Sequence, residues 1–425
     1  MNNKKMSQSL TDSRFGSWGW SMIIYAVIMY FLFAALSTDG QNLFPGAFAG
    51  MYGFDSNTLL AYATPASIVG IVGGFIFARL LIKHSTRIIS TIALIITGVV
   101  FCFWGMCSSI VLYVILLMIV CFMASGFSFI APTLMADWFP RKKGVALGWA
   151  TIGAPLSSAF FVSGFSILLA TAGFKAAFVI VGIVIIIIGI ISLFWVKDNP
   201  NQVGQHPDNM DPELAKQLSN VDNADLETSG DDPGFSVGQV LKTPNTWLIG
   251  IGYGLLWMVT VGVVSQFIPR MISVGYTQPQ ALMFLTISSI IAIPGSYFWG
   301  WLDGKIGTKL ASVIYSVSYI VALLILIFAS NIALIWIGCI FIGLGLGGIL
   351  NLIPSMVISV FGKKGFKQAN SFVTTIASLI RVLAFAIMAF CLTISGGSYT
   401  MPYIVFICAD ILGAIILFII KQNKN

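Results

Sequence analysis

Charged side chains are scarce in this sequence. Only 9% of the 425 residues are Asp, Glu, Lys or Arg, whereas 58% are hydrophobic and the mean hydropathy is +0.95. Soluble domains contain about 25% charged residues, so this chain lacks the polar side chains that a water-exposed surface needs. We therefore expect an integral membrane protein whose surface faces the lipid bilayer.

Residues that would support catalysis are equally few. The two histidines, His84 and His206, form no cluster, and the sequence contains no Walker motif. The glycine-rich run 343–348 follows no predicted strand and lies in an apolar segment, so close helix packing explains it better than nucleotide binding. We expect no enzymatic activity, no metal site and no cofactor.

Cysteine is also rare, and its spacing matches no zinc site or disulfide framework. All six cysteines fall within apolar segments, at Cys102, Cys107, Cys121, Cys339, Cys391 and Cys408. We interpret them as small buried hydrophobic residues.

The sequence is rich in long apolar segments. A helix needs about 20 apolar residues to cross the hydrocarbon core of a bilayer. Twelve segments meet this requirement: 18–44, 57–81, 88–107, 110–134, 145–171, 176–195, 247–269, 280–302, 310–329, 332–360, 368–393 and 401–420. The sequence therefore predicts an all-α membrane protein with twelve transmembrane helices, and the even number places both termini on one side.

Basic residues concentrate in alternate loops, which indicates the orientation in the membrane. The loops after the second, fourth, eighth and tenth segments contain Lys83 and Arg87; Arg141, Lys142 and Lys143; Lys305 and Lys309; and Lys363, Lys364 and Lys367. On the other side we find only Lys175 and Arg270. We therefore expect a multi-pass protein of the cytoplasmic (inner) membrane with both termini in the cytoplasm. These loops explain the net charge of +7 without nucleic-acid binding.

One long polar segment divides the chain. Residues 196–243 contain nine acidic residues and three lysines, together with several prolines and glycines. This composition is typical of a linker. We expect an N-terminal six-helix bundle over residues 1–195, a cytoplasmic linker over 196–243 and a C-terminal six-helix bundle over 244–425.

The two groups of six segments resemble each other at a fixed offset of 222 residues. Gly73 corresponds to Gly295, Lys83 to Lys305, Pro132 to Pro354 and Phe139 to Phe361. A parallel repeat of this kind is typical of transporters in which one half rocks against the other around a site in the middle of the membrane.

The loop after the eighth segment carries a motif that resembles one of the major facilitator superfamily. It reads Gly300-Trp-Leu-Asp303-Gly-Lys305-Ile-Gly307-Thr-Lys309. The stretch 148–155, which contains Gly153 and Pro155, is similar to the glycine and proline motif of antiporters in that superfamily. The resemblance implies two pseudo-symmetric six-helix bundles and assigns these residues to a conformational motif.

A second stretch narrows the resemblance. The run 136–148, Ala-Asp-Trp-Phe-Pro-Arg-Lys-Lys-Gly-Val-Ala-Leu-Gly, is similar to the branch of oxalate:formate antiporters and monocarboxylate transporters. This branch implies an organic anion bound by basic residues in helices eight and eleven. The eleventh segment contains Arg381, but the eighth, 280–302, contains no basic residue before its terminal motif. This departure favours a monoanion over a dicarboxylate.

Arg381 lies near the middle of an apolar segment that has no other formal charge. An arginine at this depth is costly and usually faces a bundle interior or a water-filled cavity. Its planar guanidinium group suits a carboxylate because it donates two parallel hydrogen bonds. Asp410 in the last segment lies at the same depth, roughly 14 to 18 Å below the outer face. Two hypotheses therefore stay open, an anion site at Arg381 and a structural ion pair with Asp410.

Other candidates are weaker. Asp39 is a second candidate for a coupling proton, besides Asp410. The repeat places Asp39 and Asn42 inside the membrane, because they align with valines of the seventh segment. Further substrate-binding candidates are the polar or aromatic residues Tyr25, Tyr30, Trp257, Gln266, Asn351 and Ser378.

These features predict a secondary active transporter that moves a small organic anion, a carboxylate, by alternating access. Anion exchange (antiport) and proton symport are both open, so the expected partners are the anion, the lipid bilayer and either protons or a counter-anion. We expect a monomer. The alternatives are an exporter of hydrophobic or amphipathic compounds and a membrane sensor that binds its ligand without transport.

Overall fold

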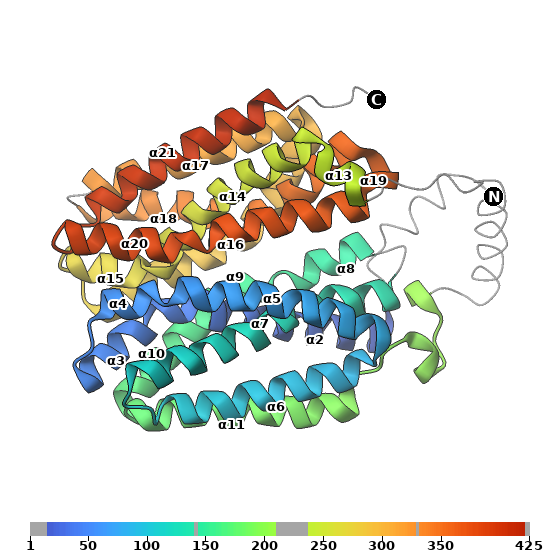
Figure 1. The fold of residues 1–425 in the computed structure, drawn as a ribbon, viewed down its shortest axis with the longest axis horizontal. Coiled ribbons are helices and arrows are strands. Elements are labelled where there is room, and N and C mark those ends of the chain that lie inside the picture. Colours follow the sequence, from blue (N-terminus) through green and yellow to red (C-terminus); the bar gives the residue numbers. More distant parts are fainter. Residues whose placement is uncertain (1–14, 140–142, 210–236, 329–330, 421–425) are drawn as a thin grey trace.

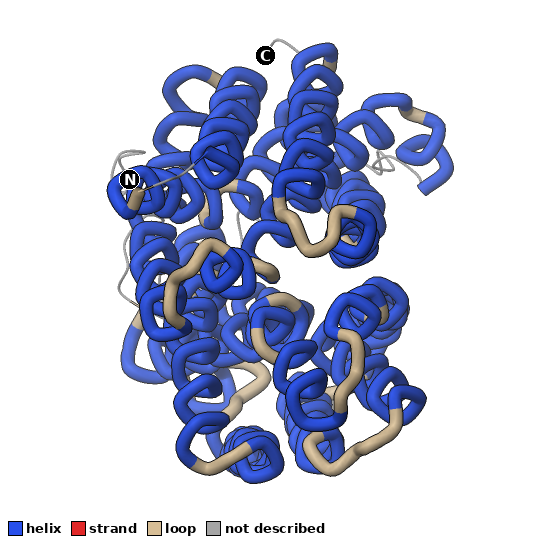
Figure 2. The backbone as a smooth tube through the Cα atoms, turned by 90° about the vertical axis from the view of Figure 1, so that its left-hand side faces the viewer, coloured by secondary structure: helices blue, strands red, loops and turns tan. Residues whose placement is uncertain are grey.

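The computed structural model describes residues 15–139, 143–209, 237–328 and 331–420. Over these residues it contains helices and loops and no strand (Figure 2). The stretches that are long and apolar enough to cross a membrane number 12. They are Gly16–Asn42, Ser56–Leu81, Thr86–Trp104, Ile110–Met135, Ala146–Thr171, Phe174–Trp195, Pro244–Ser265, Gln278–Asp303, Thr308–Phe328, Ile332–Phe361, Phe372–Ile394 and Thr400–Ile419. The prediction of an all-helical protein with twelve membrane-spanning segments is confirmed.

The N-terminal half of the described chain begins with a broken first helix. The N-terminal half consists of α2 (Gly16–Ser37), η1 (Asp39–Asn42), α3 (Phe44–Tyr52), α4 (Ser56–Ala61), α5 (Ala63–Lys83), α6 (Thr86–Trp104), α7 (Ile110–Trp138), α8 (Lys143–Ala150), α9 (Gly153–Leu156), η2 (Ser157–Phe161), α10 (Val162–Thr171) and α11 (Phe174–Trp195). The segment η2 is a π-helix. The short helices η3 (Pro200–Val203) and η4 (Pro207–Asn209) follow α11.

The C-terminal half contains α14 (Pro244–Ser265), α15 (Phe267–Ser273), α16 (Gln278–Ile306), α17 (Thr308–Phe328), α18 (Ile332–Leu346), α19 (Ile349–Arg381), α20 (Leu383–Ile394) and α21 (Thr400–Ile419). The short helix α13 (Val237–Lys242) precedes it. In Figure 1 the two halves form two adjacent groups, blue to green and yellow to red. Because α11 ends at Trp195 and α14 begins at Pro244, we keep the predicted division into two bundles as a proposal.

The two ends of the molecule differ in charge and are named accordingly. At the basic end α5 meets α6 and α16 meets α17, with Lys83, Arg87, Lys305 and Lys309 at these junctions. The opposite end carries η1, α3, α4 and α15, of which α3 and α15 lie at the left of Figure 1. The basic residues Arg141 and Lys142 and most of the linker, 210–236, lie outside the described residues.

Lipid-embedded backbone has no water to bond to, so the apolar runs form helices and polar residues mark their ends. Asp55 caps α4 by accepting hydrogen bonds from the Thr58 backbone N–H at 2.7 Å and its hydroxyl group at 2.6 Å. These bonds lower the pKa of the Asp55 carboxyl group. Thr277 and Gln280 form a capping box at the start of α16.

Four details differ from the sequence predictions. The helix α19 includes residues 361–367, where a loop was predicted, and α3 was not predicted as a separate helix. Cys107 lies in the loop after α6 instead of within a helix, and Cys408 is exposed on the molecular surface. The buried interpretation therefore fails for Cys408, because a helix surrounded by lipid also carries apolar residues on its outer face.

The first and fifth membrane-spanning segments approach each other at a glycine. A Cβ atom on Gly153 would lie 2.1 Å from the Val27 carbonyl oxygen and 2.9 Å from the Phe31 backbone nitrogen. Both neighbouring atoms belong to backbone, so they cannot rotate away. Close helix contact in membranes depends on such small residues.

We expect the substitution Gly153→Ala to lower the thermal unfolding midpoint of the purified protein. The cost is about 1 to 3 kcal/mol, as for other overpacked sites. The control is Gly164→Ala in α10, where nothing lies within 4 Å of the added Cβ atom. Equal midpoints for the two variants would show that the contact at Gly153 is not needed.

Candidate functional site

A cavity of about 610 Å³ lies between the two halves of the molecule. Small-molecule sites are typically about 300 to 1,000 Å³, so this space can hold an organic solute. The N-terminal half contributes residues of α2, η1, α5, α7, α9 and η2, and the C-terminal half contributes residues of α14, α18 and α19. The lining runs from Asp39 near the opposite end to Ala78 and Pro132, which lie nearer the basic end.

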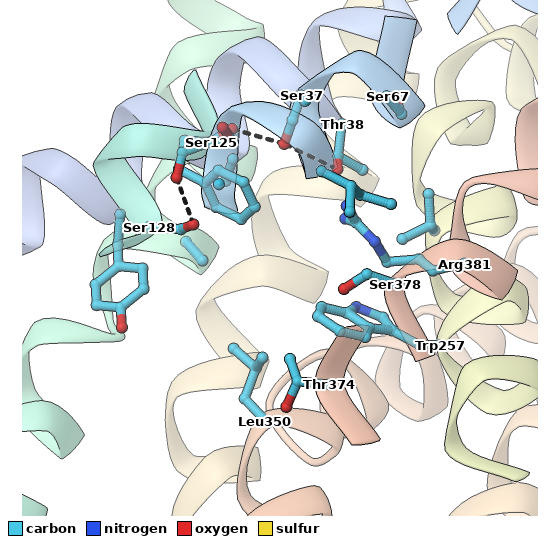
Figure 3. A pocket seen from close by; sticks show the side chains of 18 of the residues that line it. Ser37, Thr38, Ser67, Ser125, Ser128, Trp257, Leu350, Thr374, Ser378 and Arg381 are labelled. Carbon is cyan, nitrogen blue, oxygen red and sulfur yellow. Dashed lines mark hydrogen bonds between the residues drawn. The ribbon is translucent and has the colours of Figure 1, made fainter. Parts of the chain in front are cut away.

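Arg381 forms the cationic part of this cavity. Its guanidinium carbon lies 4.8 Å from the centre of the Trp257 ring, a cation–π contact that fixes the side chain against α14. Figure 3 shows the guanidinium group above Trp257 and directed toward Thr38 of the N-terminal half. Its Nε atom is buried and has no hydrogen-bond partner within the described structure. The Nε–H donor of Arg381 is therefore unused.

The rest of the wall combines hydroxyl groups with aromatic rings. Among the described lining residues, Arg381 and Asp39 are the only ones with a formal charge. The uncharged polar side chains are Ser37, Thr38, Ser67, Ser125, Ser128, Ser158, Thr260, Asn370, Thr374, Thr375 and Ser378. The aromatic ones are Tyr30, Phe33, Phe75, Phe129 and Trp257. Such a wall can hold a small solute that has one anionic group and an apolar body.

Asp39 lies on the cavity wall but is already hydrogen-bonded. Its carboxylate oxygens accept from the hydroxyl groups of Ser157 at 2.6 Å and Ser158 at 2.8 Å. The two serines begin the π-helix η2, whose wider turn presents both hydroxyl groups toward η1. Val261, which the 222-residue repeat aligns with Asp39, also lines the cavity.

Asn42 and Gln266 join the two halves instead of lining the cavity. The Asn42 amide donates to the Val264 carbonyl oxygen at 2.9 Å and accepts from the Ile268 backbone N–H at 3.2 Å. Gln266 donates to the Gln41 carbonyl oxygen at 3.2 Å. Both side chains are hydrogen-bonded across the two halves at the opposite end. The prediction that Asn42 and Gln266 bind the substrate is therefore corrected.

Two further contacts close the opposite end as a matched pair. Thr64 donates to the Val382 carbonyl oxygen at 3.1 Å, and Thr286 donates to the Ala159 carbonyl oxygen at 3.3 Å. Thr64 and Thr286 are separated by the 222-residue offset, the same separation that relates Asn42 to Val264. The pseudo-symmetry of the sequence is thus visible in the contacts.

Two other candidates lie away from the cavity wall. Tyr25 is buried within the N-terminal half, with its ring 5.7 Å from that of Trp195. Asn351 is exposed and donates to the Ser296 carbonyl oxygen at 3.0 Å, which ties α19 to α16. Both residues were predicted to bind the substrate from residue type alone. Residue type does not show toward which side of its helix a side chain points, and neither side chain lies on the cavity wall.

The expected ion pair between Arg381 and Asp410 is not present. Asp410 is fully buried, and its carboxyl oxygens have no hydrogen-bond partner among the described residues. The helix α21 packs chiefly on α14 and α17, and the Asp410 backbone is bonded to Ser316 of α17. Counting residues along each helix predicts the depth of Arg381 and Asp410 but not the direction of their side chains around the helix axes.

The predicted conformational motif lies at the basic end and at the α2–α9 crossing. Asp303 accepts a hydrogen bond from the Ser355 hydroxyl group, which links α16 to α19. Lys305 lies 4.9 Å from the centre of the Trp301 ring, and Lys309 lies 5.6 Å from that of Phe418. Gly307 has a φ of 84° and ends α16. Gly300 has open space around it, and Pro155 lines the cavity.

Several cavity residues were missed by sequence reasoning. They include Thr38, Ser67, Cys121, Thr260 and Asn370. Small polar residues are common in membrane helices, where they bond to their own backbone, so residue type gives no signal.

Comparison with known proteins identifies the class. The family model of the Major Facilitator Superfamily matches residues 15–385. The chain therefore belongs to the major facilitator superfamily and is a membrane transporter, not an enzyme.

One curated relative is the oxalate:formate antiporter of Oxalobacter formigenes, which is 26% identical over 227 residues. This match covers 53% of the chain and 50% of the relative, so the chain spans about half the length of that protein in the comparison.

Two solved structures share the fold. A D-xylose-proton symporter is 14% identical, with a TM-score of 0.71 over 96% of this chain and 99% of its own. A bacterial homologue of the human lysosomal transporter Spinster, in an inward-facing, unoccupied conformation, is 15% identical, with a TM-score of 0.68 over 96% of each chain.

We expect Asn42→Ala to weaken closure at the opposite end. The loss leaves a buried carbonyl and a buried N–H unpaired, which costs about 1 to 3 kcal/mol, or roughly a 5- to 150-fold change in population. The cavity residue Cys121 serves as the probe, in a variant from which the other cysteines have been removed. An impermeant thiol reagent is added to each side of the membrane in turn. From the side of the opposite end, it should label Cys121 faster in Asn42→Ala than in the protein with Asn42 in place.

The matched control is Asn351→Ala, which removes an amide-to-carbonyl bond within one half. This control should leave the labelling of Cys121 unchanged. Unaltered labelling in Asn42→Ala would mean that other contacts hold the opposite end closed.

Proposed function

We propose that this protein is a secondary active transporter of a small organic anion, a monocarboxylate, that works by alternating access. The observation that carries the proposal is the Arg381 guanidinium group, which lies on the cavity wall and has no acidic partner within the described residues. An unpaired cation in a low-dielectric site makes an anionic ligand favourable. A relative whose name includes oxalate and formate supports the same class of substrate.

A single cation favours one carboxylate group over two. The basic side chain of α16 is Lys305 in its last turn at the basic end, and no residue of α16 is among the described residues of the cavity wall. Ser378, one turn before Arg381, and Tyr30 on α2 both line the cavity and are candidates for hydrogen bonds to the same carboxylate. Trp257 and Phe129 provide apolar surface for the remainder of the solute.

The proposed cycle moves the two bundles, residues 1–195 and 244–425, against each other, with 196–243 as the linker. We place the protein in the cytoplasmic membrane with the basic end and both termini inside, because short basic loops are retained there. The structure would then be closed on the outside by Asn42, Gln266 and the two threonines. Asp303 and its motif are proposed to regulate closure of the basic end.

The apolar part of the wall favours one other candidate, an exporter of hydrophobic or amphipathic compounds. The two proposals differ in the role of charge. An exporter of neutral compounds would bind esters and free acids alike, whereas the carboxylate transporter would bind the acids alone. A sensor would bind its ligand and show no uptake.

We expect Arg381→Ala to abolish uptake of carboxylates into proteoliposomes and Arg381→Lys to retain part of it. Charge-assisted hydrogen bonds contribute about 1.5 to 3 kcal/mol, so affinity should fall by roughly 10- to 150-fold in the alanine variant. The assay uses a panel of labelled mono- and dicarboxylates with the corresponding methyl esters, and a thermal-shift measurement reports binding.

The control for this experiment is Arg79→Ala, which removes an exposed arginine of α5. Unchanged uptake in both Arg381 variants would contradict the proposal. Counterflow, in which unlabelled anion inside the vesicle accelerates uptake of labelled anion, separates exchange from net transport.

A further inference from the structure

Asp410 is the most unusual charged residue of the C-terminal half. It lies in the middle of α21, it is fully buried, and both of its carboxyl oxygens lack a hydrogen-bond partner in the described part of the chain. Burying an ionised carboxylate without a partner is much more costly than burying its neutral form. A group kept in this position therefore needs a reason other than packing.

Two tyrosines of α17 lie beside this carboxyl group. Tyr315 and Tyr319 flank Ser316, which bonds to the Asp410 backbone, and their rings are 5.4 Å apart. The Tyr319 hydroxyl group is buried and has no hydrogen-bond partner in the described structure. The Ser316 hydroxyl group donates to the Asp410 backbone carbonyl oxygen at 3.2 Å, which fixes α21 against α17.

The tyrosines connect to the cavity through Thr260. The Thr260 hydroxyl group lies 2.9 Å from the Tyr315 hydroxyl group, and Thr260 itself lines the cavity. A row of hydroxyl groups, Thr260, Tyr315 and Tyr319, thus leads from the cavity toward Asp410. Each of these groups can accept one proton and donate another.

Other titratable groups near Asp410 do not provide a counter-charge. The helices α14 and α20 contain no Asp, Glu, Lys, Arg or His, and their titratable residues are Tyr253 and Cys391. On α17 the cation is Lys309, which lies at the basic end against Phe418. Arg270 lies at the opposite end, where it donates to the Leu326 carbonyl oxygen at 2.7 Å and contacts Tyr399 and Tyr403.

We propose that Asp410 is a proton-binding site that communicates with the cavity through Thr260, Tyr315 and Tyr319, and that it couples anion transport to proton movement. The proton comes from water in the cavity. The Thr260 and Tyr315 hydroxyl groups are already hydrogen-bonded, whereas transfer onward requires the Tyr319 hydroxyl group to rotate into contact with Tyr315 and Asp410, because neither Tyr319 nor the carboxyl group has a hydrogen-bond partner in the described structure. Each hydroxyl group gains one proton and loses another, and the carboxylate becomes a carboxylic acid with no other bond changed. The coupling rests on the proposed function, whereas the proton site does not.

The main test uses Asp410→Asn in proteoliposomes that contain a pH-sensitive dye. An applied carboxylate gradient should move protons in the wild type and not in this variant. Carboxylate binding, measured by thermal shift, should change by no more than about twofold, as for distant independent sites. Counterflow exchange should persist. Proton movement at the wild-type ratio to carboxylate in Asp410→Asn would overturn the coupling.

Asp55→Asn is the matched control, because it makes the same change at an exposed carboxyl group that caps α4. It should keep wild-type proton movement. Tyr315→Phe removes one hydroxyl group of the row and should slow proton movement several-fold with Asp410 in place. A merely structural Asp410 would lower stability in Asp410→Asn and leave the proton-to-carboxylate ratio intact.

Infrared spectroscopy tests the proton site without any substrate. The difference spectrum between wild type and Asp410→Asn at neutral pH should contain the C=O band of a protonated carboxylic acid, and Tyr315→Phe should retain that band. Its absence would overturn the proton site. If the band is present and the wild-type vesicles take up no carboxylate, the proposed function fails and the proton site stands.

Discussion

A guanidinium group at membrane depth needs compensation for its charge, and the site is organised around this requirement. Arg381 obtains part of it from the face of Trp257 and none from an acidic side chain of the described chain. Cation–π contacts contribute about 0.5 to 2 kcal/mol, which is less than the cost of an arginine in the membrane. The remaining compensation has to come from water or from a bound anion, so an unoccupied cavity and an occupied one differ in energy. That difference can bias the two halves toward opening or closing.

The two membrane acids show how the same chemical group takes different roles. Asp39 receives two serine hydroxyl groups from the π-helix η2, which leaves it stabilised on the cavity wall. Asp410 receives no such donors among the described residues and lies between helices instead of on the wall. The first arrangement holds η1 to η2, whereas the second leaves a carboxyl group whose protonation is sensitive to its connection with the cavity.

Composition and periodicity were sufficient to predict the fold, because lipid restricts the backbone to helices of nearly fixed length. The family resemblance came from loop motifs, and the structure places the candidates Arg381, Tyr30, Trp257, Ser378 and Asp39 on the cavity wall. Asn42, Gln266, Tyr25 and Asn351 were not on its wall, since an apolar helix carries no amphipathic pattern to show which face meets a neighbour. The lack of an ion pair between Asp410 and Arg381 was hidden for the same reason.

The twin contacts of Thr64 and Thr286 have a consequence for how such a chain can change. Contacts that recur in both halves close the molecule evenly on either side of the pseudo-two-fold axis, and their chemistry is a threonine and a backbone carbonyl oxygen. Arg381 is different, because its counterpart at the repeat offset is Ala159. Both halves therefore contribute equivalent contacts that close the cavity, whereas only the C-terminal half carries the arginine proposed to bind the solute. Substitutions around the arginine can alter which solute is accepted and leave the mechanical pairing of the halves as it is.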